Sequence, residues 1–293
     1  MNKYEILNVL MKMFNSLLGE SVTYRLGRSM YMHSRGDIPN DMNRNGEVLV
    51  QNAVITAMQK LSSKSDFTIF DVGANVGDWT NSFVRQLKKQ SFVEKIDIYA
   101  FEPVPSTAIT LRNNIPKNSL FIHVEELALS SNSGVADIYV TGENFGINSL
   151  YEDDSGIKKE LIRIHLNSAS EFCNSRLIHH IHLLKCDTEG HDMEVIRGAI
   201  QLLNDERISV LQFEYNHRWA FSHNFLRDVF VTVADMPYTV AKLQKNYLLL
   251  FEEWNLELDR FFEGNYVLIH DDALSWFPTK RGNFDSSHAL CIT

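Results

Sequence analysis

The segment best suited to bind a ligand contains two glycines and lies in the first third of the chain. Asp71, Gly73, Ala74, Asn75 and Gly77 follow a short β-branched and aromatic run and precede an amphipathic segment. A strand, a glycine turn and a helix N-terminus in this order receive nucleotide-like ligands in parallel α/β sheets. The Gly-x-x-x-Gly spacing differs from the Gly-x-Gly-x-x-Gly of dinucleotide enzymes. It favours a nucleoside with an amino-acid tail, such as S-adenosylmethionine.

Polar residues also follow the other predicted strands, at the sheet edge where such ligands bind. Glu102 follows the second strand, where a carboxylate can accept hydrogen bonds from both ribose hydroxyls of a nucleoside. Asp187 follows a nearly apolar strand, and we expect it beside the methionine part and the transferred group. The predicted cofactor-binding residues are Asp71, Gly73, Ala74, Asn75, Gly77, Glu102, Pro103, Glu126, Leu127, Ala128 and Asp187.

The elements that must position these residues alternate between strand and helix. Strands are predicted at about 68–72, 96–101, 120–124, 181–186 and 208–213, with helices at about 47–61, 78–90, 105–114 and 193–203. Such alternation predicts a parallel α/β sheet with right-handed crossovers. An antiparallel hairpin insertion is predicted from 136–141 and 161–166, around a Gly- and Asn-rich middle. Further strands are expected near 238–243, 247–251 and 265–270.

The chain is predicted to have three parts. Residues 1–46 form an N-terminal helical extension and loop, residues 47–272 the main domain, and residues 273–293 an irregular tail. The first helix, 1–18, has apolar residues at helical spacing. Two interpretations fit this helix: it packs on the domain or on a second subunit of a homodimer, or it lies on a membrane surface. No apolar run is long enough to span a membrane.

An ordered set of motifs over about residues 47–270 closely resembles the FkbM family of S-adenosylmethionine-dependent methyltransferases. The most specific motif is Leu184-Lys185-Cys186-Asp187-Thr188-Glu189-Gly190, followed by Gly198-Ala199. The others are 70–80, 101–103, 128–130 with Gly134, 148–150, 213–214 and 265–266. The resemblance implies a three-layer, Rossmann-like class I methyltransferase sheet of seven strands, the last antiparallel. It also implies O-methylation of a hydroxyl on a sugar, glycolipid or secondary metabolite.

Methyl transfer to a hydroxyl is faster when a nearby group removes the hydroxyl proton. A positioned general base contributes roughly 10²–10⁴-fold. The predicted catalytic residues are Asp187, Glu214 and His217, with His191 as a further candidate base. A divalent metal is the alternative route. Asp187, Glu214 and Asn216 offer oxygen ligands of the kind that Mg²⁺ prefers.

The composition of the chain indicates which class of molecule it binds and in which cellular compartment it works. The formal net charge is −9, whereas a nucleic-acid binder needs a basic surface, so we expect a small-molecule or glycan hydroxyl acceptor. Three cysteines suit a reducing compartment, and we expect the cytoplasm. Two other functions remain open. A non-catalytic scaffold would keep the sheet without the reaction, and an NAD-dependent oxidoreductase would need a different glycine spacing.

Overall fold

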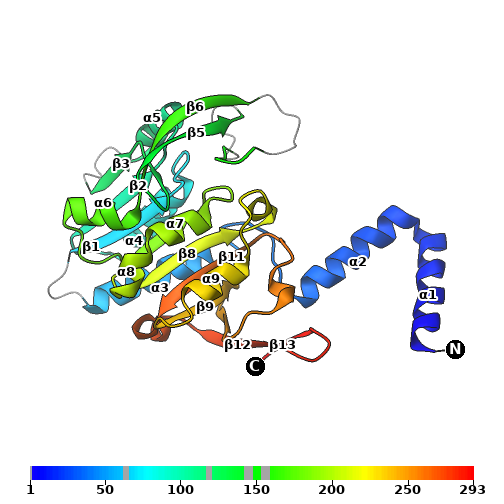
Figure 1. Ribbon diagram of the computed structural model, residues 1–293. Coiled ribbons are helices and arrows are strands. Elements are labelled where there is room, and N and C mark those ends of the chain that lie inside the picture. The colour runs from blue at the N-terminus through cyan, green and yellow to red at the C-terminus, as the bar shows by residue number, and fades with distance from the viewer. Residues whose placement is uncertain (1, 62–65, 117–120, 142–147, 153–158) are drawn as a thin grey trace.

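A computed structural model of the protein describes residues 2–61, 66–116, 121–141, 148–152 and 159–293 (Figure 1). Seven strands of its main sheet have the order and directions of a class I methyltransferase sheet. Strands β1, β2, β3, β7 and β8 are parallel to one another, and β11 is antiparallel to both β8 and β9. In order across the sheet these strands are β3 (Ile122–Glu125), β2 (Ile96–Phe101), β1 (Phe67–Val72), β7 (Leu183–Cys186), β8 (Val210–Tyr215), β11 (Gly264–His270) and β9 (Tyr238–Leu243).

Three more strands extend this sheet to ten, which corrects the predicted count of seven. They are β10 (Leu248–Phe251), β12 (Thr279–Phe284) and β13 (Leu290–Ile292). The expectation of an irregular tail was wrong. Most of β12 is exposed, so its sequence lacks the apolar alternation that reveals a half-buried strand. It becomes a strand because its backbone pairs with β10 and β13 at the sheet edge.

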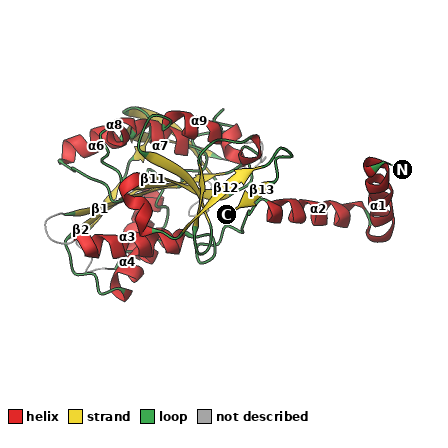
Figure 2. Cartoon of the chain, turned by 90° about the horizontal axis from the view of Figure 1, so that it is seen from below, coloured by secondary structure: helices red, strands yellow, loops and turns green. Residues whose placement is uncertain are grey.

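Helices cover both faces of the sheet, which confirms the predicted three layers (Figure 2). The two largest apolar clusters of the described residues lie on opposite faces of the sheet, since neighbouring β1 residues Ile69 and Phe70 belong to different clusters. One layer contains α3 (Glu47–Leu61) and α4 (Asp78–Lys89); the other contains α6 (Ala169–Arg176), α7 (Asp192–Gly198), α8 (Ile200–Asn204) and α9 (Leu226–Thr232). Helix α5 (Pro105–Asn114) contacts β3. The described residues also form the short 3₁₀ helices η1 (His217–Ala220), η2 (Leu256–Leu258) and η3 (Asp271–Trp276).

The predicted hairpin insertion forms a separate small sheet above the main one in Figure 1. Strands β5 (Gly134–Val140) and β6 (Glu160–Asn167) pair antiparallel, as expected, and β4 (Ala128–Leu129) pairs parallel with β6. Most of the Gly- and Asn-rich middle lies outside the described residues, apart from Asn148.

Two helices precede α3 at the N-terminal end of the described chain. Helix α1 (Lys3–Leu18) confirms the predicted first helix, and α2 (Glu20–Ser34) continues from it after Gly19. Both project away from the rest of the molecule (Figures 1 and 2). A search of the described residues for a helix long and apolar enough to cross a membrane found none.

Candidate active site

A cavity that is partly open to solvent lies at the carboxyl ends of β1, β2 and β7. The insertion closes it from the other side through Ile138, Asn148 and Leu150. This is the edge where the strand order reverses, between β1 and β7, and where open α/β sheets bind ligands. Its other lining residues are Val72, Gly73, Asn75, Phe101, Glu102, Pro103, Leu127, Ala128, Leu129, Asp187, Thr188, Glu189 and His191.

The glycine loop passes very close to the end of β7. Gly73 has a φ of +78°, and a Cβ at this position would lie 1.9 Å from the carbonyl oxygen of Asp187. Only glycine fits such a close approach at this backbone angle. The backbone N–H groups of Gly73 and Ala74 both donate to the carbonyl of Phe101, at 3.0 and 2.9 Å. The loop is therefore held between the ends of β2 and β7, and Gly77 caps α4 behind it.

Glu102 is buried on the cavity wall and held by two backbone donors. Its Oε2 accepts from the N–H of Asn75 and its Oε1 from the N–H of Val104, both at 3.0 Å. Burial raises the pKa of its carboxyl to about 7, although the two backbone hydrogen bonds oppose this shift. Each oxygen keeps acceptor capacity for a hydroxyl of a bound nucleoside.

Asp71 lies behind the cavity wall. Its side chain is fully buried, its Oδ2 accepts from Thr80 Oγ1 at 2.6 Å, and its Oδ1 lies 3.4 Å from Lys185 Nζ. The same ammonium lies 3.4 Å from Asp187 Oδ2. Burial alone would lower the pKa of Lys185, but Asp187, Asp71 and Glu47 outweigh it and raise that pKa. Sequence reasoning assigned no role to Lys185; the signal was a lysine inside an otherwise apolar strand.

Two carboxylates, Asp187 and Glu189, line the cavity beside the glycine loop. The Asp187 side chain is 40% exposed, and its Oδ2 lies 3.4 Å from the ammonium group of the buried Lys185. Glu189 is paired with Arg218, whose Nε lies 2.9 Å from Glu189 Oε2. Burial, assisted by the charge of Asp187, raises the pKa of Glu189 to about 8. The sequence placed Glu189 at this edge, yet Glu189 was absent from the predicted catalytic residues.

Glu214 was predicted to follow its strand, but it lies inside β8. The strand extends this far because Glu214 pairs with Asn265 of β11. It is buried and does not line the cavity. Its Oε1 accepts from Asn40 Nδ2 at 2.7 Å and its Oε2 from Asn216 Nδ2 at 2.6 Å. Burial and the nearby charges of Asp187 and Glu189 raise its pKa well above the usual range.

The same contacts bear on the predicted metal ligands. Asn216 Oδ1 accepts from the N–H of Arg218 at 2.8 Å, so the amide nitrogen of Asn216, not its oxygen, faces Glu214. A Mg²⁺ ion needs oxygen ligands directed at one point. The amide-capped Glu214 does not offer this arrangement. Across the described part of the chain, no group of three or more His, Cys, Asp or Glu is arranged to hold a metal.

The two candidate histidines occupy different environments. His217 is exposed at the start of η1 and lies outside the cavity lining. His191 lines the cavity, and its ring nitrogens lie 2.9 Å from Tyr151 Oη and 3.0 Å from Ser130 Oγ. Burial lowers the pKa of His191 to about 4, so its ring is neutral at pH 7. With both nitrogens engaged, His191 positions Tyr151 of the insertion against the cavity.

Of the three cofactor-binding residues predicted after β3, two line the cavity and one does not. Leu127 and Ala128 line the cavity, as does Pro103 after β2. Glu126 instead forms a surface ion pair with Arg112, whose Nη1 lies 2.5 Å from Glu126 Oε1, and it is absent from the cavity lining.

The strand order, the glycine loop and the carboxylates at the strand ends define a Rossmann-like fold of the class I methyltransferase type. A family model described as the methyltransferase FkbM domain matches residues 71–240, more than half of the chain. The chain therefore belongs to the FkbM methyltransferase family, as its motifs predicted. By family and fold it is an S-adenosylmethionine-dependent methyltransferase, which displaces the oxidoreductase alternative.

The solved structures to which the chain has distant similarity include three methyltransferases. A precorrin-6y C5,15-methyltransferase from Geobacter metallireducens is 13% identical, with 76% of this chain and 88% of that chain covered and a TM-score of 0.38. The plantazolicin methyltransferase BpumL, in complex with SAH, is 10% identical, with 92% and 98% covered and a TM-score of 0.38. A putative rRNA-methylase from Clostridium thermocellum is 6% identical, with 77% and 97% covered and a TM-score of 0.42. No curated protein matched the chain.

The cavity fits the cofactor that the family implies. The absence of a side chain at position 73 lets the glycine loop pack directly against the Asp187 backbone while Gly73 lines the cavity. A buried carboxylate at position 102 suits ribose hydroxyls, and it lines the same cavity as Gly73 and Asn75.

Proposed function

We propose that this protein is an O-methyltransferase that acts on a hydroxyl of a sugar, glycolipid or secondary metabolite. The observation that carries the proposal is the pair of carboxylates on the cavity wall, Asp187 and Glu189, beside the glycine loop. A carboxylate with a pKa near neutrality suits proton removal from a hydroxyl. S-adenosylmethionine supplies an activated methyl group when bound.

In this proposal the cofactor is held by Gly73, Asn75, Glu102, Pro103, Leu127 and Ala128, which share one cavity. Asp71, Ala74 and Gly77 do not line the cavity. They support the conformation of the glycine loop instead. We give Glu126 no cofactor contact, because Arg112 holds it at the surface. The acceptor enters beneath the insertion, whose Ile138 and Leu150 provide apolar contact area.

We assign proton removal to Glu189 and orientation of the acceptor to Asp187. The ammonium group of Lys185 lies 3.4 Å from Asp187 Oδ2 and orients this carboxylate, which can accept a hydrogen bond from the acceptor hydroxyl. Glu189 is the proposed base, since burial and the charge of Asp187 raise its pKa to about 8. His217 and Glu214 lie outside the cavity lining, so neither has a direct part in the proposed reaction. No metal step enters this scheme.

The proposed compartment is the cytoplasm. Its support is that Cys173, Cys186 and Cys291 are all free thiols, two of them buried. The domain bounds 1–46, 47–272 and 273–293 remain part of the proposal, with strands β12 and β13 in the last segment.

The test of this function is a transfer assay with S-adenosylmethionine labelled in its methyl group and a panel of sugar, glycolipid and phenolic hydroxyl acceptors. Label in an ether product with an acceptor from the panel supports O-methylation. Label that appears only with amine or thiol acceptors would contradict it.

A further inference from the structure

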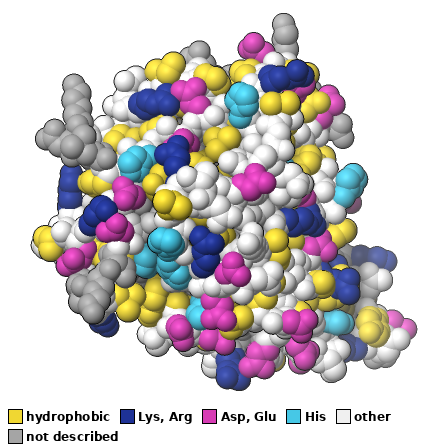
Figure 3. All heavy atoms as spheres, turned by 60° about the vertical axis from the view of Figure 1, so that its left-hand side comes forward, with side chains coloured by type: hydrophobic (Ala, Val, Ile, Leu, Met, Phe, Trp, Pro, Cys, Tyr) yellow, Lys and Arg dark blue, Asp and Glu magenta, His cyan; other side chains and the backbone are white. Residues whose placement is uncertain are grey.

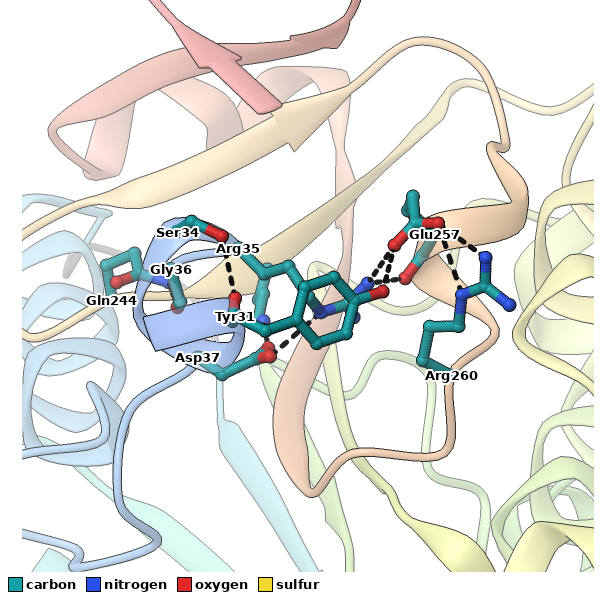
Figure 4. Close-up of polar contacts among 9 residues, drawn as sticks. Tyr31, Ser34, Arg35, Gly36, Asp37, Gln244, Glu257 and Arg260 are labelled. Atoms are coloured by element: carbon teal, nitrogen blue, oxygen red, sulfur yellow. Dashed lines mark hydrogen bonds and ion pairs between the residues drawn. The ribbon is translucent and has the colours of Figure 1, made fainter. Parts of the chain in front are cut away.

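Helices α1 and α2, which we call the arm, are fixed at their base to the main domain. Near the end of α2, Tyr31 Oη donates to the carboxylate of Glu257, and Arg35 Nη1 lies 3.2 Å from Glu257 Oε2 (Figure 4). Gln244 Nε2 donates to the carbonyl of Gly36 at 2.8 Å. These contacts join the arm to β9 and η2, so the base does not pivot freely.

A buried ion cluster strengthens this attachment. Asp37 lies between Arg35, whose Nε is 2.9 Å from Asp37 Oδ2, and Lys242 of β9, with which it forms an ion pair. These three side chains are 8% exposed or less. Separating buried charges of this kind is costly, because each would be left without its partner. The direction in which the arm leaves the domain is therefore set by the fold.

The outer helix of the arm exposes an extensive apolar surface. No residue of α1 is buried, and its large apolar side chains are between 41% and 81% exposed. Apart from Lys3 at its first position, its polar side chains lie in one strip along the helix. The apolar side chains are Tyr4, Ile6, Leu7, Val9, Leu10, Met11, Met13, Phe14, Leu17 and Leu18, and the strip contains Glu5, Asn8, Lys12, Asn15 and Ser16.

A helix of this composition requires a partner. A helix that is apolar on most of its circumference is normally buried, and an isolated helix of this length is marginal in water. Gly19 turns α1 away from the axis of α2, and Figures 1 and 2 show it standing clear of the main sheet. The rigid base prevents the arm from folding back, so the partner comes from outside this chain.

The exposed area matches that of a stable dimer. Specific interfaces bury roughly 1,200–2,000 Å² in total, or about 600–1,000 Å² on each partner. Ten large apolar side chains, each at least 41% exposed, offer surface of this order on one arm. The face of the domain seen in Figure 3 instead carries acidic, basic and hydrophobic side chains intermingled. The arm is therefore a better candidate for self-association than that face.

Charge disfavours a lipid surface as the partner. Helix α1 contains two basic residues, Lys3 and Lys12, and one acidic residue, Glu5, whereas membrane-surface helices usually carry a polar face rich in Lys and Arg. The chain after residue 34 contains 24 Lys and Arg against 35 Asp and Glu. A domain of this charge is repelled by anionic lipid.

We propose that two copies of this chain form a symmetric dimer in which α1 of each arm packs its apolar face against the other arm. The two methyltransferase domains then lie at opposite ends of a central helical bundle. Because α1 adds no side chain to the core of the domain, the interface can be disrupted without unfolding the enzyme.

The test is the mass of the full chain in solution at micromolar concentrations, by light scattering after size-exclusion chromatography. Wild type is expected at twice the chain mass, and the double variant Leu10→Glu/Phe14→Glu at the chain mass, with an unchanged near-UV circular dichroism spectrum. The matched control is Asn8→Glu/Asn15→Glu, which adds the same charge to the polar strip and should stay dimeric.

Three results would overturn the proposal. Wild type could be monomeric, the Leu10→Glu/Phe14→Glu variant could stay dimeric, or both double variants could dissociate equally. Flotation of the wild type with phosphatidylcholine–phosphatidylglycerol vesicles, lost in the Leu10→Glu/Phe14→Glu variant, would assign the apolar face to lipid instead.

Discussion

The ammonium group of Lys185 lies 3.4 Å from a carboxylate oxygen of Asp187, at the point where β7 meets the cavity. The same group lies 3.4 Å from Asp71, which is fully buried beneath the glycine loop. One lysine thus neutralises a structural carboxylate on one side and a cavity carboxylate on the other. This relationship couples the stability of the loop to the charge state of the site.

Replacement of Lys185 by Met should destabilise the protein strongly. It leaves Asp71 buried without its counter-charge, and breaking a buried pair costs roughly 3–5 kcal/mol. The measurement is the free energy of unfolding in urea. Lys95→Met is the control, because Lys95 pairs with Asp66 at the exposed surface, and we expect no measurable change there. Equal effects of the two substitutions would refute the role of Lys185.

Glu102→Gln should weaken S-adenosylmethionine binding and change its pH dependence. The pKa of Glu102 is raised to about 7, so its carboxyl loses its proton as the pH rises through that value. If the ionised form accepts the ribose hydroxyls, wild-type affinity increases from pH 6 to pH 8 relative to the variant. The titration of the ligand is common to both proteins and cancels in this ratio. A ratio that stays constant over this range would contradict the assignment.

Glu189→Gln should lower kcat by roughly 10²-fold or more, because it removes the proposed base. The affinity for S-adenosylmethionine should change little. The pKa of Glu189 is raised to about 8, and a base acts in its deprotonated form, so wild-type kcat should rise with pH and level off above that value. The variant should lack this rise. Glu252→Gln is the control, since Glu252 pairs with Arg281 at the surface. An identical pH profile in Glu189→Gln would exclude Glu189 as the base.

Removal of divalent metal should leave methyl transfer unaffected. Both oxygens of Glu214 accept hydrogen bonds from amide groups, so Glu214 is not free to ligate an ion beside Asp187. The initial rate should be the same before and after dialysis against EDTA. A loss of activity that added Mg²⁺ restores would show that the ligand set rearranges in the working enzyme.

The sequence predicted those parts of the fold in which local pattern and tertiary structure agree. The β-branched run before Gly73 made the strand β1 and the turn recognisable, and the structure confirms both within one residue. Strand β12 could not be found in this way, because it is held by pairing at an edge and is largely exposed.

The same distinction applies to the candidate site. Spacing alone placed Gly73, Glu102, Asp187 and Glu189 at one edge, since parallel strands end together. The contact of Asn40 with Glu214 joins residues 174 positions apart, and no local pattern encodes it. Likewise, the raised pKa of Glu189 depends on burial and on Asp187, which only the folded chain brings together.

The most direct test of the central claim is a calorimetric titration of Gly73→Ala and Gly134→Ala with S-adenosylmethionine, beside the wild type. A Cβ at position 73 would lie 1.9 Å from the Asp187 carbonyl, whereas a Cβ at position 134 meets nothing within 4 Å. The account predicts that wild type and Gly134→Ala bind equally and that Gly73→Ala loses at least about tenfold in affinity, or 1.4 kcal/mol. Equal binding by all three proteins, or no binding by the wild type, would contradict it.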